Sequence, residues 1–340
     1  MQTRRQFIAQ STACIGGYML LPAAFQQDKN RIMTVSGWKS VDKIGFSLIH
    51  EHVLVDFVGA DKVSPSRYDA DEVFRIALPK LLEVKEKGCL TLFECTPAYL
   101  GRDVKLLKRL SDASGLNIVT NTGYYGAVGE KYFPAHAHTE SAQQIANRCF
   151  KEWKNGIDGT GVKPGFIKCS VDTLPFTATQ TKVIEAAAIT HLATGLTIGI
   201  HTGNGEAAMQ EKKIIESKGV SPAAWIWIHA QNEKDRNIHL QIAKAGGWVS
   251  YDGVNNDSID DCLSFLKDMK KENLLQQLLL SHDSGWYDPG KPGGGTFNGY
   301  TTIADKLIPA MKENGFSEKD IYQLFVINPV NAFSIRVRRK

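Results

Sequence analysis

The 340-residue sequence has few cysteines, little excess charge and, after its first 25 residues, no long apolar run. The formal charge is +4, and Arg4 and Arg5 contribute two of those charges within a candidate leader that contains no acid. A remainder so close to neutral gives no reason to expect nucleic acid or an acidic membrane surface as a partner. The only basic cluster, residues 336–340, is expected to be a short solvated C-terminal end.

The first 25 residues form a candidate export signal. Two adjacent arginines and Phe7 are followed by an apolar stretch to Leu21 and by small residues at 23 and 24. These are the parts of a secretory leader, and the paired arginines are typical of a bacterial twin-arginine signal. We therefore expect residues 1–25 to be a removable signal peptide and the protein to be exported to the periplasm. The remainder lacks the roughly 18 apolar residues of a membrane span, so none is expected in the mature chain.

The cysteines give no evidence of a metal-binding or disulfide framework. Outside the leader they are odd in number and form no CxxC pair: Cys89, Cys95, Cys149, Cys169 and Cys262. This spacing excludes a zinc finger, although export would permit one or two disulfides. Three of the cysteines lie on or beside apolar runs, so we expect mostly free, buried thiols.

The composition, with 43% hydrophobic and 22% charged residues, is that of a globular protein with a substantial core. Short apolar runs alternate with segments of helical periodicity. The runs are 44–49, 90–95, 117–122, 165–170, 196–200, 225–228, 248–251 and 277–280. The helical segments are 71–87, 103–113, 141–153, 179–193, 207–218, 234–245, 258–271 and 301–314. This order predicts that residues 26–340 form one α/β domain, a (β/α)8 TIM barrel with parallel strands.

A doubly wound open sheet would give the same alternation of strands and helices. The two folds differ in where the ends of the strands meet, because only a closed ring brings distant strand ends round one central point. In this sequence, polar residues with the chemistry of metal ligands follow strands one, four, five, six and eight. That distribution favours the barrel.

The first of these polar groups is a pair of histidines at the end of strand one. Residues two apart on a strand share a face, so His50 and His52 are expected to point into the barrel while Glu51 points toward the helices. That geometry suits two ligands of one metal ion, although such pairs also occur by chance. A second pair, His136 and His138, follows a proline in a predicted loop and is not expected to be catalytic.

Lys168 lies in the apolar fourth strand, Gly165-Phe166-Ile167-Lys168-Cys169. Burial disfavours the ammonium form, and no acid in the neighbouring sequence is an obvious partner. A neutral amine can react with carbon dioxide to form a carbamate, whose two oxygens are able to bridge two cations. The alternative is a lysine whose head group reaches solvent at the rim or pairs with an acid.

Three further strands end in a residue that can bind a metal. His201 and His229 end apolar strands five and six, and Asp283 follows strand eight. Neutral imidazole is a common ligand of zinc, and a buried carboxylate is costly unless it is paired or metal-bound. Each histidine alone could be a hydrogen-bonded core residue, so the argument for a metal site rests on the whole set.

The order of these residues resembles the phosphotriesterase family of the amidohydrolase superfamily, including its lactonase relatives, over roughly residues 35–334. The resemblance implies two divalent metal ions, with zinc expected, and an N6-carboxylysine at Lys168 that bridges them. It implies that His50, His52 and Asp283 bind the more buried ion. His201 and His229 would then bind the more exposed one.

The resemblance also implies a mechanism, in which a hydroxide bridging the metals attacks a phosphorus or carbonyl centre. Asp283 would accept its proton, so Asp283 and Lys168 are the expected catalytic residues. Tyr125 resembles a pocket tyrosine of lactonase-like members, and Trp286 lies in the loop after strand eight; both are expected substrate-binding residues. His282 should face away from the metals.

The ends of strands six and seven depart from the family pattern. The first reads Ala230-Gln231-Asn232, without the acid that phosphotriesterases carry after strand six, and the second reads Tyr251-Asp252-Gly253, without the histidine of phosphotriesterases or the arginine of lactonases after strand seven. The sequence therefore predicts a metal-dependent hydrolase of a carboxylic ester, lactone or phosphotriester, acting on a small molecule. An amidohydrolase cleaving a C–N bond and an exported metal- or ligand-binding protein without turnover are the alternatives. The sequence leaves the oligomeric state open, with a homodimer among the options.

Overall fold

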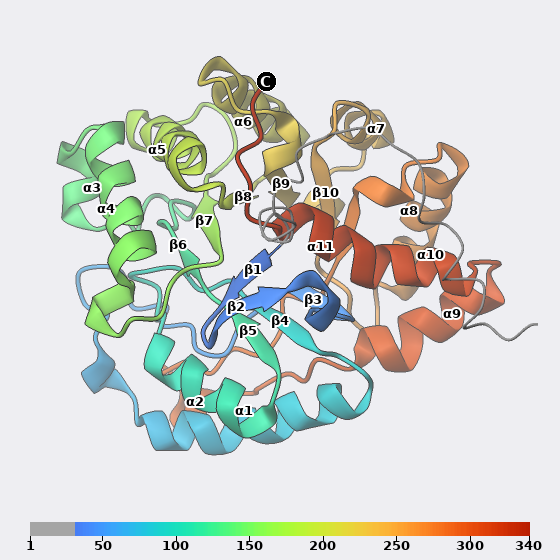
Figure 1. Cartoon of the computed structure of the whole chain (residues 1–340), viewed down its shortest axis with the longest axis horizontal. Coiled ribbons are helices and arrows are strands. Elements are labelled where there is room, and N and C mark those ends of the chain that lie inside the picture. The colour runs from blue at the N-terminus through green and yellow to red at the C-terminus, as the bar shows by residue number, and fades with distance from the viewer. Residues whose placement is uncertain (1–30) are drawn as a thin grey trace, which may run out of the picture.

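The computed structural model describes residues 31–340, and the predicted leader lies outside the described residues. A central ring of parallel strands is surrounded by helices (Figure 1). The strands of the ring are β3 (Ser47–Glu51), β4 (Thr91–Glu94), β5 (Asn117–Val119), β6 (Asn121–Thr122), β7 (Phe166–Ser170), β8 (Thr197–His201), β9 (Trp225–Ile228), β10 (Trp248–Tyr251) and β11 (Leu278–Leu280). The main helices between them are α1 (Ala70–Glu86), α2 (Val104–Ser114), α4 (Ala142–Asn155), α5 (Ala178–Thr194), α6 (Gly205–Ser217), α7 (Arg236–Lys244) and α8 (Ile259–Lys271).

The strands close into a (β/α)8 barrel, which confirms the predicted fold. Strands β3 to β5 pair in sequence order, and so do β6 to β11. The third predicted strand is split at Thr120, so that β5 and β6 follow each other along the chain. The last strand meets the first through the backbone, because Asp283 N donates to His50 O at 3.0 Å and His52 N donates to Ser284 O at 2.8 Å.

The helices begin and end where their sequences place capping residues. In α2 the side chain of Asp103 accepts hydrogen bonds from two backbone N–H groups of the first turn, and Gly115 ends the helix with φ +70°. In α5 a capping box joins Thr177 and Gln180, and Gly195 ends the helix at φ +79°. These signals explain why the predicted helices agree closely with the observed ones.

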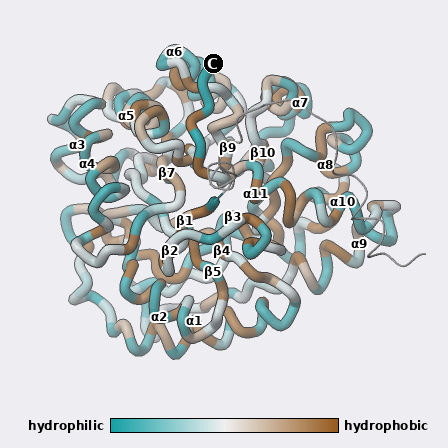
Figure 2. The backbone as a smooth tube through the Cα atoms, in the orientation of Figure 1, coloured by the Kyte–Doolittle hydropathy of each residue, from teal (hydrophilic) through white to brown (hydrophobic). Residues whose placement is uncertain are grey.

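The apolar core has two layers, one inside the barrel and one between the barrel and the helices. Along the surrounding helices, hydrophobic residues alternate with hydrophilic ones (Figure 2). Inside the barrel, Phe93 and Phe166 pack against Phe333 of α11 (Asn328–Phe333), with 4.0 Å between the ring centroids of Phe93 and Phe333. Ile32 of β1 (Arg31–Thr34) joins this cluster. These residues close the end of the barrel opposite the carboxyl ends of the strands, and the polar groups gather at the other end.

Several elements at the ends of the chain were not predicted from the sequence. An antiparallel hairpin of β1 and β2 (Gly37–Ser40) precedes the barrel and lies with α11 across one end of it (Figure 1). The last predicted helix begins as a π-helical turn (Ile303–Leu307) that continues into α9 (Ile308–Glu313). It is followed by α10 (Glu318–Tyr322), a second π-helical turn (Gln323–Ile327) and α11. The hairpin strands, RIMT and GWKS, lack the continuous apolar run of the barrel strands, and single-turn helices are too short to show helical periodicity.

Two local expectations were wrong. His136 and His138 lie in a short helix, α3 (Ala135–Thr139), and not in a loop. The C-terminal run 336–340 is not simply solvated, because Arg338 is buried and Lys340 N donates to Gly219 O at 3.0 Å. The guanidinium of Arg338 donates to backbone carbonyls at the end of α11, which anchors the tail on the barrel.

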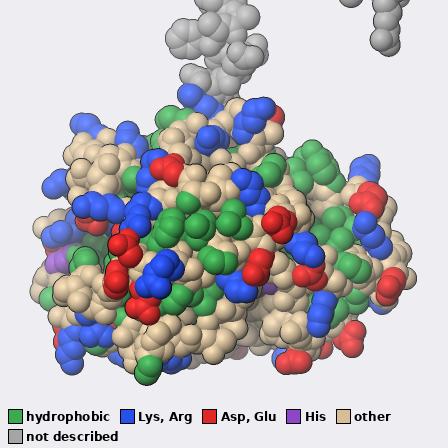
Figure 3. Space-filling model, turned by 90° about the horizontal axis from the view of Figure 1, so that it is seen from below, with side chains coloured by type: hydrophobic (Ala, Val, Ile, Leu, Met, Phe, Trp, Pro, Cys, Tyr) green, Lys and Arg blue, Asp and Glu red, His purple; other side chains and the backbone are tan. Residues whose placement is uncertain are grey.

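The predicted free and buried thiols are confirmed for all five cysteines of the described part of the chain. No helix within residues 31–340 is long and apolar enough to cross a membrane. On the face shown in Figure 3, cationic and anionic side chains are interspersed, with apolar side chains gathered near the middle. This pattern agrees with the nearly neutral charge of the sequence.

Candidate metal centre

Three of the predicted ligands converge at the carboxyl ends of β3 and β11. His52 Nε2 lies 3.0 Å from Asp283 Oδ1 and 3.3 Å from His50 Nε2, and His50 Nε2 lies 3.6 Å from Asp283 Oδ1. Both histidines are buried. Asp283 Oδ1 is also buried and makes no hydrogen bond of acceptable geometry among the described residues. Three atoms with available lone pairs therefore face one another at a distance typical of neighbouring ligands of one cation.

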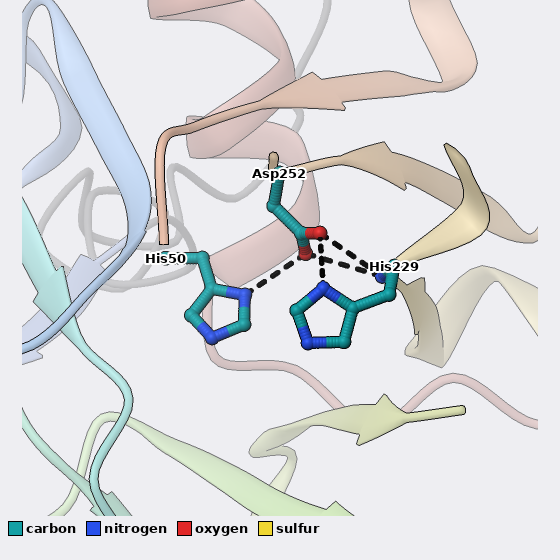
Figure 4. A group of neighbouring side chains, drawn as sticks. All are labelled: His50, His229 and Asp252. Atoms are coloured by element: carbon teal, nitrogen blue, oxygen red, sulfur yellow. Dashed lines mark hydrogen bonds and ion pairs between the residues drawn. The ribbon is translucent and has the colours of Figure 1, made fainter. Parts of the chain in front are cut away.

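Asp252 fixes the orientation of two imidazoles. Its Oδ2 lies 2.9 Å from Nδ1 of His50, and its Oδ1 lies 2.7 Å from Nδ1 of His229. In Figure 4 both rings turn Nδ1 toward the carboxylate and Nε2 away from it. Because a carboxylate only accepts hydrogen bonds, each Nδ1 must carry the proton, which leaves the lone pair of each Nε2 free for a metal.

Asp252 is part of a group of three residues, with His50 and His229, that could itself hold an ion. Its distances to both Nδ1 atoms are those of hydrogen bonds, and the ring nitrogens that face Asp283 are the Nε2 atoms. We therefore assign Asp252 as the residue that positions two ligands, and not as the centre of a separate metal site.

His201 and His229 extend the cluster to the ends of β8 and β9. Their ring centroids are 4.2 Å apart, and His229 Nε2 lies 3.7 Å from Asp283 Oδ2. His229 and Asp283 both have positive φ, at +64° and +55°. Left-handed backbone is strained for residues with a Cβ and is concentrated at functional sites. The end of the barrel is thus held in a conformation that brings these two side chains inward.

Lys168 is 1% exposed on β7, in the same end of the barrel. Its Nζ makes no hydrogen bond or ion pair with any described residue, and the ring of Tyr125 lies 5.7 Å away. A buried amine without a hydrogen-bond partner is costly, which makes it a second polar group here that the protein alone does not satisfy. The alternative of a lysine that reaches solvent at the rim is wrong.

The ionisable groups of this cluster affect one another strongly. Burial alone would raise the pKa of Asp252, but His229 and His50 outweigh it and hold that pKa well below its usual range. Burial would also raise the pKa of Asp283, but His50 and His52 outweigh this effect and lower that pKa. Burial, with His229 nearby, lowers the pKa of His201 well below the ordinary value. The ionised carboxylate of Asp283 and neutral imidazole such as that of His201 form a donor set that suits divalent cations such as zinc.

His52 is oriented by a different group. Its Nδ1 lies 2.8 Å from Thr96 Oγ1, in the loop after β4. Asn121 donates to the carbonyls of Glu94 and Thr96 at 3.0 Å, which fixes the backbone that carries this hydroxyl. His52 therefore has its own positioning residue.

The two predicted substrate-binding residues lie beside this cluster. Tyr125 Oη is 3.2 Å from both ring nitrogens of His201, and Trp286 packs edge-on against His52 at 5.7 Å between centroids. Both belong to an apolar cluster at the mouth of the barrel, here called the mouth cluster: Val55, Phe57, Leu100, Tyr125, Tyr132 and Trp286. It forms an aromatic, uncharged wall next to the candidate ligands.

Two other histidine predictions can be compared with the structure. His282 faces away from the cluster, because its Nδ1 contacts Glu51 Oε1 at 2.7 Å and its Nε2 accepts from Ile303 N at 3.0 Å. Of the second pair, His136 contacts the hydroxyl of Tyr124 at 2.9 Å, and His138 lies 3.5 Å from Glu130. These three histidines make their contacts outside the candidate metal centre.

The roles of Asp252 and Thr96 were not predicted from the sequence. Asp252 directly follows β10, and Asp283 lies three residues after the end of β11, so a similar signal of an acid near a strand end was available. The role of Asp252 depends on contacts with His50, 202 residues away, and with His229, which the sequence next to Asp252 does not indicate. Thr96 gave no comparable signal, since a threonine after a strand is common and its role depends on the distance to His52.

Comparisons with known proteins agree with this geometry. The model of the phosphotriesterase family matches residues 30–333. An aryldialkylphosphatase of Saccharolobus solfataricus is 29% identical over 302 residues, covering 86% of this chain and 95% of the relative. An N-acetyltaurine hydrolase of Xenopus tropicalis is 23% identical over 341 residues, covering 88% and 96%. The solved structure of a double mutant of organophosphorus hydrolase from Deinococcus radiodurans has a TM-score of 0.80 at 26% identity, covering 89% of this chain and 97% of that one.

Proposed function

Because this chain belongs to the phosphotriesterase family, we propose that it is a binuclear-metal-dependent hydrolase that cleaves an ester bond of a small molecule. The substrate class is a carboxylic ester, a lactone or a phosphotriester. The observation that carries the proposal is the convergence of His50, His52 and Asp283, with His201, His229 and buried Lys168 around them.

The residues would divide between two ions. His50, His52 and Asp283 would hold one, and His201 with His229 the other. Zinc is the expected metal, because neutral imidazole nitrogens and carboxylate oxygens are its common ligands. When bound, two divalent ions supply a Lewis acid and lower the pKa of water enough to provide a nucleophile at neutral pH.

Lys168 would connect the two halves of the centre as an N6-carboxylysine. Its unprotonated Nζ forms a bond to the carbon of carbon dioxide, and the displaced proton leaves to solvent. The product is an anion with two oxygen donors in place of a buried amine that has no hydrogen-bond partner. This change would satisfy the buried polar group and add negative charge between the histidines.

Asp283 is the expected proton acceptor. Its carboxylate lies within 3.0–3.7 Å of the Nε2 atoms of three histidines, and its side chain is partly open to the mouth of the barrel. An attacking water held there would lose its proton to Asp283 as its oxygen bonds to the carbonyl carbon or phosphorus; the C–O or P–O bond of the ester would then break, and Asp283 would return the proton to the leaving oxygen. Asp252 and Thr96 would keep the imidazoles oriented during this step.

The mouth cluster supports an uncharged substrate. Its members are apolar or aromatic, and the polar atoms they offer include the Tyr125 hydroxyl and Trp286 Nε1, which is buried without a hydrogen-bond partner among the described residues. An ester, lactone or phosphotriester can pack against this apolar surface and accept a hydrogen bond from Tyr125 or Trp286. The named aryldialkylphosphatase relative supports the same choice, and the N-acetyltaurine hydrolase keeps C–N cleavage as the second candidate.

A substrate panel with metal-loaded protein tests the proposal. The panel contains lactones, aryl esters, phosphotriesters and N-acyl compounds, and metal content is measured on the same preparation. We expect about two ions per chain and turnover of at least one ester class. Turnover of N-acyl compounds alone would replace ester cleavage by the amidohydrolase alternative. Two bound ions without turnover on any substrate would favour a binding protein.

Export is part of the proposal. The paired arginines of residues 1–25 support secretion of a folded protein that acquires its metal before transport. Fractionation of cells that produce the full chain, with and without the Arg4→Lys and Arg5→Lys substitutions, tests this. Metal-loaded protein should be found in the periplasm for the wild-type chain and in the cytoplasm for the double variant.

A further inference from the structure

A cleft of about 670 Å³ opens on the side of the barrel, and none of the candidate metal ligands lines it. We call it the side cleft. Its walls come from the β3–α1 connection, the β4–α2 connection, the end of β6 and the C-terminal half of α4, and its chemistry is set by six residues: Tyr68, Tyr99, Arg102, Tyr124, Arg148 and Lys151. The volume falls within the roughly 300–1,000 Å³ of small-molecule sites.

The side cleft and the metal centre lie on opposite sides of a shared wall. Two pairs of adjacent residues form this wall, and each pair divides its side chains between the two spaces. Tyr99 lines the cleft while Leu100 joins the mouth cluster. Tyr124 lines the cleft while Tyr125 reaches His201. The cleft is therefore a separate space with its own lining, and not an extension of the metal centre.

The aromatic part of the cleft is a group of three tyrosines. The hydroxyl of Tyr68 donates to Asp103 at 2.8 Å, and that of Tyr124 contacts His136 Nε2 at 2.9 Å, so both rings are fixed. Tyr99 packs edge-on against Tyr124 at 5.7 Å between centroids, and its own hydroxyl has no hydrogen-bond partner among residues 31–340. Tyr99 also has a φ of +66°, which is strained for a residue with a Cβ, and its side chain lines the cleft. A flat aromatic group can pack on such a surface.

The charged part of the cleft contains one cation, Lys151, that has no ion pair among the described residues. Arg102 is buried and makes two hydrogen bonds to Glu152, at 2.6 and 3.0 Å, so this pair is neutral. Lys151 is exposed and has no ion pair within the described residues, whereas Asp158 is exposed on the turn after α4. The lining side chains are thus three cations and two acids.

Arg148 supplies a directed donor on the same helix as Lys151. Its Nε and Nη2 donate to Glu140 at 2.7 and 2.5 Å, and its Nη1 makes no hydrogen bond with any described residue. Lys151 and the free Nη1 group lie three residues apart on α4, which places them on neighbouring turns of one helix face. Together they can bind one carboxylate.

We infer that the side cleft binds a small aromatic carboxylate, with its ring on Tyr99 and Tyr124 and its carboxylate at Lys151 and Arg148. A carboxylate fits better than a more highly charged phosphate because Lys151 is the one lining cation without an ion pair among the described residues, and Arg148 already pairs with Glu140. The site does not depend on the metal centre, so it stands whether or not the protein hydrolyses an ester.

Calorimetric titration of metal-loaded protein with 2-naphthoate tests this inference. We expect one site on wild type and about tenfold weaker binding to Lys151→Glu, because the substitution replaces an attractive charge with a repulsive one. Lys154→Glu is the matched control, because Lys154 is exposed on the same helix and does not line the cleft; its affinity should match wild type. Cyclohexanecarboxylate, which has the charge but no aromatic face, should bind about fivefold more weakly than 2-naphthoate.

A carboxylate could also bind at the metal centre, and Lys168→Ala separates the two sites. We expect 2-naphthoate to bind the Lys168→Ala variant as tightly as wild type. No binding to wild type, equal binding to Lys151→Glu, or binding that disappears only in Lys168→Ala would each overturn the inference.

Discussion

Asp252 contacts His229 at two points, the imidazole and the backbone: Oδ1 lies 2.7 Å from Nδ1 and 3.1 Å from the backbone nitrogen. The backbone of His229 is left-handed, so this double contact holds a strained residue in place. The other carboxylate oxygen reaches His50 Nδ1 at 2.9 Å. One fully buried carboxylate thus orients a candidate ligand of each metal ion.

We predict that Asp252→Asn weakens metal binding about 10–100-fold, the usual effect of losing a residue that orients metal ligands. The Asn side chain keeps the shape, but its amide nitrogen is a donor and can no longer accept from both Nδ1 atoms. Metal affinity is measured by competition with a chelator. Ser250→Ala is the control, because Ser250 only donates to Asp252 at 3.1 Å and its loss leaves both imidazole contacts. Equal losses in the two variants would contradict the assigned role.

A second prediction concerns the proposed carbamate. Lys168→Ala should lose both metal and activity, and short carboxylates such as acetate should partly restore both, because they can occupy the space that the side chain leaves. Lys168→Met is the matched variant. Its side chain fills that space without a donor, so added carboxylate should not rescue it. Full activity of unrescued Lys168→Ala would remove Lys168 from the centre.

The sequence predicted the barrel because each strand and helix carried a local signal. Strands β8 and β9 are largely apolar and each ends at or next to a histidine, and β7 is apolar on either side of Lys168. Periodicity and strand-end polarity depend only on neighbouring residues, so they can be read without the structure. The split of the third strand at Thr120 carried no such signal.

Contacts between distant parts of the chain could not be predicted in the same way. Asp252 and His50 are 202 residues apart, and nothing near either residue indicates the other. The anchoring of the C-terminal tail has the same cause, since Arg338 in a basic run looks like a solvated residue. Its burial becomes evident only when α11 and Thr197 are placed beside it.

A third prediction concerns Glu211, a buried carboxyl on α6. Burial raises its pKa well above the ordinary 4.5, although hydrogen bonds from Thr202 and Trp225 oppose this. The contacts agree with a protonated side chain. Thr202 Oγ1 lies 2.9 Å from Ile200 O and 2.8 Å from Glu211 Oε1, and its single proton cannot serve both acceptors. A protonated Glu211 donates to Thr202, while its other oxygen accepts from Trp225 Nε1 at 3.1 Å.

This assignment gives a pH dependence with a definite sign. The raised folded pKa means that Glu211 contributes stability below pH 4.5, which is lost as the pH rises through the folded pKa. Glu211→Gln keeps the hydrogen bonds without titrating. Its free energy of unfolding should therefore rise relative to that of wild type by up to about 1.4 kcal/mol per pH unit above 4.5. Urea unfolding between pH 4.5 and 8 measures the difference. Glu206→Gln, an exposed position on α6, should follow wild type throughout. A constant difference for Glu211→Gln would mean that the carboxyl is already ionised.

The last prediction concerns Arg338 in the C-terminal tail. Its guanidinium donates to the carbonyls of Asn331, Ala332 and Ser334 at 2.7–3.2 Å. These carbonyls lie at the C-terminal end of α11, so Arg338 caps that helix. Arg338→Ala removes a charged donor and leaves buried carbonyls unpaired, so we expect a loss of about 2–3 kcal/mol in the free energy of unfolding. Arg336→Ala should change stability by less than about 0.5 kcal/mol, because Arg336 is exposed. Denaturant unfolding distinguishes the two residues. Since α11 places Phe333 in the end of the barrel opposite the metal centre, Arg338→Ala should lower stability while leaving metal affinity of the folded protein unchanged.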